Sequence, residues 1–288
     1  QYGKAIDSNI RSQAVDQLFA ERWGDHPLPN LGTYPLSHRM HAGHALDFIR
    51  YAATVQGNYK TANEAARRMT SRITDNAVAV RGGQKHVSAA WLVLKIFGKW
   101  DELLAITPAH QGTPYMDGIW SYALGSAHVA KGNMNEALQQ LAKLKTIAEA
   151  PNADDYRVGA TPASAVLQLA AFGLEGETLM AQGDLSAAIE AFRAGVAIED
   201  QNNYTEPPDW AQPMRHYLGA ALLKAGQPEA AEAVYRRDLR WNQNNGWSLF
   251  GLHQALAAQN KQGEAIQVFN QWQKAWTTAD VTLTASHL

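Results

Sequence analysis

The chain has 288 residues, of which 46% are hydrophobic and 18% charged, and its formal net charge at pH 7 is -2. This apolar content is enough for a sizeable core, whereas the near-neutral charge argues against nucleic acid as the main partner. No apolar run approaches the roughly 18 residues of a membrane span, and the absence of Cys excludes disulfides and thiolate chemistry.

The predicted elements, in chain order, are helices separated by short turns. The first is an amphipathic helix over Tyr2–Asp16. After it, the same turn recurs at intervals of 41, 34, 51, 43 and 34 residues. The turn residues are Gly57, Gly98, Gly132, Gly183, Gly226 and Asn260.

Small or apolar residues recur at fixed distances from these turns. The position five residues after each turn is occupied by Ala62, Leu103, Ala137, Ala188, Ala231 and Ala265. In Tyr217–Tyr235 the pattern is clearest, because Gly219 and Ala231 allow two helices to approach closely on either side of Gly226. The pattern predicts helical hairpins that stack on one another. The longer intervals are expected as loops at Asn76–Lys85, Glu149–Thr161 and Gln201–Gln212, which are rich in Gly, Pro, Asn and Asp.

This pattern resembles the tetratricopeptide repeat (TPR) family over nearly the whole chain. The resemblance implies an all-α fold, a right-handed α-α superhelix of about six helical hairpins forming a TPR-like solenoid. It implies one domain over 1–288, with a half-repeat and connector at 1–30 and six hairpins at 41–288. The first helix of each hairpin would line a concave groove.

Three segments carry a narrower resemblance, to a little-characterised group of bacterial TPR proteins that are often exported. They are YTEPPDWAQPMRHYLGAALL (204–223), NNGWSLFGL (244–252) and ADVTLTAS (279–286). The resemblance implies a periplasmic or secreted protein, with the cytoplasm as the alternative. Members of the group often show a His-x-x-His-Phe run, but here Asp47 stands in the place of the second His, after His44 and before Phe48.

The N-terminal helix matches the second half of a further hairpin. A half-repeat leaves an apolar face open, and solenoids normally cap such faces. We therefore expect the natural protein to continue upstream with a further domain or repeats. The alternative is that Tyr2–Asp16 is a capping helix.

The resemblance to the repeat family also predicts groove residues, at 13, 10 and 6 positions before each turn. The mixed aromatic and charged character of these positions suits a peptide, a protein segment or a small ligand. With Trp210, which precedes the fifth hairpin, the expected groove residues are His44, Asp47, Tyr51, Lys85, Ser88, Tyr122, Glu177, Trp210, His216, Trp247, Phe250 and Gln254. Glu206 and Asp209 would add carboxylates beside His216; alternatively, their segment is a rigid connector anchored by Trp210.

An alternative site is built from His41, His44 and Asp47, whose spacing places them on one helical face. Imidazole and carboxylate groups bind zinc, copper or iron, and a His beside an Asp serves as a general base. The leading prediction has no cofactor. The chain lacks a nucleophile elbow, GxGxxG and HExxH, which favours a binding or scaffold module over an enzyme.

Overall fold

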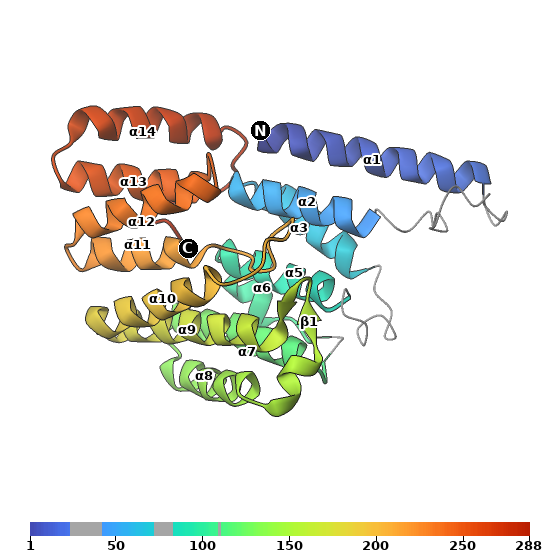
Figure 1. Ribbon diagram of the computed structural model, residues 1–288, viewed down its shortest axis with the longest axis horizontal. Coiled ribbons are helices and arrows are strands. Elements are labelled where there is room, and N and C mark those ends of the chain that lie inside the picture. Colours follow the sequence, from blue (N-terminus) through green and yellow to red (C-terminus); the bar gives the residue numbers. More distant parts are fainter. Residues whose placement is uncertain (24–41, 72–82, 109–110) are drawn as a thin grey trace.

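The computed structural model describes residues 1–23, 42–71, 83–108 and 111–288, and this part of the chain is all-α apart from one two-stranded sheet (Figure 1). In the first half the helices are α1 (Tyr2–Trp23), α2 (Ala42–Val55), α3 (Tyr59–Thr70), α5 (Gly83–Ile96), α6 (Trp100–Leu104), α7 (Pro114–Ala130) and α8 (Met134–Ala148). In the second half they are α9 (Ala163–Gln182), α10 (Leu185–Glu199), α11 (Met214–Lys224), α12 (Pro228–Trp241), α13 (Gly246–Ala258) and α14 (Gln262–Ala275). No described helix is both long enough and apolar enough to cross a membrane.

Consecutive helices pack against each other, and the predicted turn residues lie between them. All six turn residues have positive φ, from 59° at Asn260 to 88° at Gly183. Left-handed backbone is costly for most side chains but not for Gly, and Asn tolerates it better than most. The following helices begin with side-chain caps in several cases: the Asn58 and Asp184 side chains accept hydrogen bonds from the backbone N–H groups of Thr61 and Ala187.

Small residues let the helices approach closely. The residues five positions after the turns are all buried, with at most 1% of their surface exposed. A Cβ built on Gly219 would lie 2.3 Å from Tyr235, so the tyrosine ring of α12 fits only because α11 has no side chain there. These contacts join the paired helices as the sequence pattern predicts.

The connecting segments contain more structure than their composition suggests. The predicted loop at Glu149–Thr161 contains a 3-10 helix (Pro151–Asp155) and a small antiparallel sheet of β1 (Arg157–Val158) and β2 (Thr161–Pro162). The predicted loop Asn76–Lys85 is wrong at its end, because α5 begins at Gly83; its residues 76–82 lie outside the described part of the chain. Residues 201–213, the connector loop, have no regular helix or strand.

The last helices pack against the first hairpin. Trp276, which follows α14, lies against two glycines: a Cβ on Gly57 or Gly246 would lie only 2.2 or 2.1 Å from its ring. Trp247 donates from its indole N–H to the backbone oxygen of Thr54 at 2.8 Å. A hydrophobic cluster continues this closing contact through α2, α3, α5 and α13, and α14 and α2 lie near each other at the top of Figure 1.

The C-terminal segment, residues 277–288, continues from the closing contact between the helices. The Asp280 carboxylate accepts from the backbone N–H groups of Tyr59 and Lys60, at the start of α3. Further along, Leu283 is buried in the hydrophobic cluster and the Ser286 hydroxyl donates to the backbone oxygen of His216 at 2.6 Å. The segment therefore links the first hairpin to α11.

Trp276→Ala tests the closing contact. Removal of a buried indole leaves a cavity and is expected to lower the free energy of unfolding by about 3–5 kcal/mol. Trp241→Ala is the matched control, because Trp241 is 73% exposed, and it is expected to change stability by less than about 0.5 kcal/mol. Urea denaturation followed by circular dichroism measures both; equal effects of the two substitutions would contradict the packing described.

Candidate functional site

Most of the predicted groove residues are buried against the chain itself. Tyr51, Lys85, Phe250 and Gln254 are half-buried, and His44 is exposed. Those with less than a tenth of their surface exposed are Asp47, Ser88, Tyr122, Glu177, Trp210, His216 and Trp247. The expectation of an open groove is therefore corrected at these seven positions, whose side chains are buried by the chain itself.

A buried ion pair lies on the inner face of the helices, the side of α5, α7, α9 and α11 that carries Lys95, Tyr122, Glu177 and Tyr217. The Lys95 ammonium donates to the Glu177 carboxylate and to the Tyr217 hydroxyl, both at 2.8 Å. It also lies 4.6 and 4.7 Å from the ring centres of Tyr122 and Tyr217, close enough for cation–π attraction. Burial alone would lower the pKa of Lys95, but the Glu177 carboxylate and the Tyr217 hydroxyl raise it above its usual value, so the lysine is charged. Predicted site residue Glu177 thus joins α9 to α5, and Lys95 in turn joins α5 to α11.

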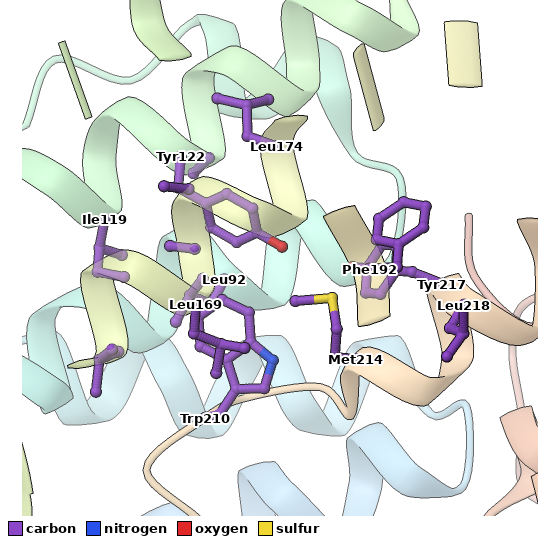
Figure 2. Packing of buried hydrophobic residues seen from close by; sticks show 14 of the residues in the cluster. Leu92, Ile119, Tyr122, Leu169, Leu174, Phe192, Trp210, Met214, Tyr217 and Leu218 are labelled. Atoms are coloured by element: carbon purple, nitrogen blue, oxygen red, sulfur yellow. The ribbon is translucent and has the colours of Figure 1, made fainter. Parts of the chain in front are cut away.

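The connector loop fills the inner face beside this pair. Trp210 is buried with its ring 5.5 Å from that of Tyr122, and Figure 2 shows it among Leu92, Leu169 and Met214. This confirms the interpretation of Trp210 as a hydrophobic anchor. Asp209 of the same loop accepts hydrogen bonds from the hydroxyl and backbone N–H of Thr161. These bonds attach the connector loop to β2 of the small sheet.

Asp47 and Lys85 belong to a second buried network. The Asp47 carboxylate is 2.6 Å from Arg50 through one oxygen and 3.1 Å from Lys85 through the other. Burial opposes its ionisation, but these two cations hold the pKa of Asp47 below its usual value. Lys85 also donates to the backbone oxygen of Pro207 at 3.0 Å and so ties α5 to the connector loop. Ser88, one turn on, shares a hydrogen bond with the Tyr115 hydroxyl.

The residues of the alternative metal site do not come together as a ligand set in the described structure. His41 lies outside the described residues. The His44 ring is exposed and packs on Phe48 at 4.8 Å, while both oxygens of Asp47 are taken by Arg50 and Lys85. Among the described residues no group of three or more His, Asp or Glu side chains is placed to hold a metal ion. These contacts do not favour a metal at His44 and Asp47.

The remaining predicted residues bind to the chain's own segments. His216 is buried 3.5 Å from the Asp238 carboxylate. Gln254 donates to the backbone oxygen of Thr284 in the C-terminal segment, at 3.0 Å. Phe250 packs on Trp272 with ring centres 5.3 Å apart. These contacts stabilise the last two helical pairs.

A cavity of about 630 Å³ lies at the edge of this filled inner face. It is bounded by the start of α1, the second half of α2, the ends of α10 and α12, and the connector loop. Across it, the Tyr51 hydroxyl donates to the Asn242 side chain at 3.2 Å, and the Tyr2 ring meets Tyr51 edge to face. Two large aromatic side chains on its lining, Tyr204 and Trp241, are 82% and 73% exposed. Exposed aromatic residues beside a concavity are typical of binding sites.

The carboxyl group of Glu199 is a strongly perturbed titratable group of this lining. It accepts a hydrogen bond from the Met214 backbone N–H at 2.8 Å. Burial, with the neighbouring carboxylates of Asp238 and Asp200, raises the pKa of Glu199 to about 8, against the opposing effects of the Met214 N–H and Arg215. A strongly perturbed group in a concavity is a candidate functional residue.

The sequence predicts site roles for four lining residues, which are Tyr51, Glu206, Asp209 and Trp210. It predicts none for Tyr2, Glu199 and Trp241. These three lie on α1, α10 and α12, and they meet only because distant elements pack together. The one local sign of the site in the sequence is Trp241, which directly precedes the polar run 242–245. A scan against protein-family models gives no match, and a search of curated proteins gives none either.

Lys95→Met tests the buried ion pair. It leaves the Glu177 carboxylate buried without its cation and is expected to cost about 3–5 kcal/mol of stability, most of which Lys95→Met combined with Glu177→Leu should restore. Lys145→Met is the matched control, because Lys145 pairs with Glu175 at the same 2.8 Å but is 44% exposed; it should cost less than about 1 kcal/mol. Urea denaturation of all variants decides, and a double variant as unstable as the single one would contradict the pairing.

Glu199→Gln tests the raised pKa. Because the folded protein keeps a proton that the unfolded chain releases above its ordinary pKa of 4.5, Glu199 makes stability fall as the pH rises towards about 8. The fall is up to about 1.4 kcal/mol for each pH unit. Denaturation at pH 5.5 and pH 8 should show a smaller fall for Glu199→Gln than for the wild type or for Glu190→Gln, an exposed position on the same helix. Identical pH dependence in all three would contradict the assignment.

Proposed function

We propose that this chain is a TPR-like binding module whose ligand site is the cavity beside the connector loop. The helical pairs, the left-handed turns and the buried small residues support a six-hairpin superhelix of that family. The ligand would be a small molecule or a side chain of a peptide, since a volume of about 630 Å³ suits such a group.

The observation that carries the proposal is the pair of exposed aromatic side chains on the cavity lining. Trp241 ends α12 and Tyr204 lies in the connector loop, and both leave most of their surface in solvent. Neither ring contributes much to the core, so burial on folding does not explain them. Rings of this kind give large contact area on binding at little conformational cost.

The position of the cavity also suits a binding module. Its walls come from α1, α2, α10 and α12, and these helices pack on α2, α9 and α13 of the helical pairs. The one irregular wall is the connector loop, itself anchored by Trp210 and Asp209. A site on rigid elements loses little freedom when a ligand binds. We favour binding over catalysis, because the described lining shows no nucleophile paired with a base.

Trp241→Ala and Tyr204→Ala test the binding site. The probe is a mixture of small cationic, neutral and anionic aromatic compounds with short peptides, observed by saturation-transfer NMR. At least one compound should receive saturation from the wild type and lose at least about half of it in either variant, since each removes a hot-spot type of contact.

The control for this experiment is Leu138→Ala, which removes another partly exposed apolar side chain, on α8 and outside the cavity. It should leave the NMR effects unchanged. If no compound binds, or if binders respond equally to all three substitutions, the cavity is not the binding site.

A further inference from the structure

The charges on the cavity lining are unbalanced. Five carboxylates line it, against two guanidinium groups. The carboxylates are Glu199, Asp200, Glu206, Asp209 and Asp238. An excess of one sign inside a concavity raises the local concentration of ions of the other sign.

Both guanidinium groups are already engaged. Arg215 makes two parallel hydrogen bonds with Asp200, at 2.8 and 2.7 Å. Arg237 lies over the Trp241 ring at 5.7 Å. Asp209, in turn, is 3.4 Å from Lys85 and bonded to Thr161. The described lining therefore leaves the carboxyl groups of Glu199, Glu206 and Asp238 without a Lys or Arg partner.

Asp238 and Glu199 are neighbouring carboxyl groups of the cavity lining, and their contacts differ. The Asp238 oxygens accept from the Asn242 amide at 2.9 Å and the Ser248 hydroxyl at 2.6 Å, with the His216 ring at 3.5 Å. Burial opposes its ionisation, but these three neighbours keep the pKa of Asp238 below its usual value. Its negative charge therefore faces Glu199, whose own ionisation would be favoured by a cation in the cavity.

Aromatic rings supply the rest of the lining. Tyr2, Phe48, Tyr51, Tyr204, Trp210 and Trp241 all belong to it. The negative face of an aromatic ring attracts a desolvated cation, and rings grouped with carboxylates are the usual surroundings of bound quaternary ammonium groups. Anionic ligands, by contrast, would meet uncompensated carboxylates.

One buried polar group of the lining has no partner within the described chain. The indole N–H of Trp210 is enclosed, with the residue 6% exposed, and makes no hydrogen bond there. A buried donor without an acceptor is costly. Because this nitrogen is enclosed and the Trp210 ring packs among Leu92, Leu169 and Met214, the N–H faces the core and not a ligand in the cavity.

We propose that the cavity binds an organic ammonium ion, such as a quaternary amine. This rests on the proposed binding function and specifies its ligand class. Glu199 and Asp238 supply the counter-charge, and Tyr51, Tyr204 and Trp241 supply the rings.

The test compares two probes of the same shape, choline and 3,3-dimethylbutan-1-ol, in which carbon replaces the ammonium nitrogen. Dissociation constants are measured by titration with saturation-transfer NMR at pH 8. Choline should bind at least about fivefold more tightly than the alcohol, because only it carries the charge. Glu199→Gln should weaken choline binding at least about fivefold and leave the alcohol unchanged, whereas Glu190→Gln should alter neither.

A pH series adds a readout that a merely structural role of Glu199 would not move. Choline has a fixed charge, so its affinity should rise as the pH goes from 6 to 8 and Glu199 loses its proton in the presence of Asp200, Asp238 and Arg215. The rise should be absent in Glu199→Gln, which keeps an oxygen to accept from Met214.

The outcomes separate the two proposals. Equal affinity for choline and the alcohol, or binding of the alcohol alone, with loss in Trp241→Ala, would keep the binding site and overturn the ammonium ligand class. Failure of both probes, while other compounds of the NMR mixture bind at Trp241, would overturn it as well. Failure of every compound would overturn the binding function itself.

Discussion

The contact between Trp276 and two glycines is the constraint on which the structure depends. The indole ring lies where a side chain on Gly57 or Gly246 would lie, so it joins the first described turn to the start of α13. The Trp247 indole and the Asp280 carboxylate bind the same region through Thr54 and the start of α3. Because these contacts close the chain on itself, the chain's own segments fill the inner face.

The buried charged residues of the inner face form ion pairs with one another. Lys95 with Glu177 and Asp47 with Arg50 are buried ionic groups, and each would be costly without its partner. Lys95 and Glu177 join α5 to α9, and Asp47, paired with Arg50 on its own helix, also reaches Lys85 of α5. The cavity that we propose as the binding site lies where the connector loop and α1 meet the helical pairs, and its lining includes exposed aromatic rings and carboxyl groups without a Lys or Arg partner.

The turns and the close helix contacts were predictable from the sequence, because both are local. Gly57 and Asn260 lie at turns with positive φ, and Ala231 is buried, as expected from residue type and spacing alone. The inward direction of Tyr122 and Glu177 follows from the same spacing. Local pattern sufficed wherever one helix and its neighbour decide the environment.

What fills the inner face was not predictable, because it depends on contacts between distant segments. The C-terminal segment carries no repeat pattern, yet Leu283 and Ser286 are buried between helices. Likewise Glu199 and Trp241 come to one cavity only after α10, α12 and the connector loop pack. For this reason the prediction of an open groove fails at the seven positions that the chain itself buries.

The distance between the first turn and the C-terminal segment tests this account most directly. The chain has no Cys, so Lys60→Cys and Thr278→Cys, both at exposed positions, can be spin-labelled without background. The Lys60 N–H binds Asp280, two residues from Thr278. Pulsed electron–electron double resonance should therefore give one narrow distribution of short distances between the two spin labels. A broad distribution extending to long distances would show that the first turn and the C-terminal segment separate in solution, and it would contradict the closed arrangement.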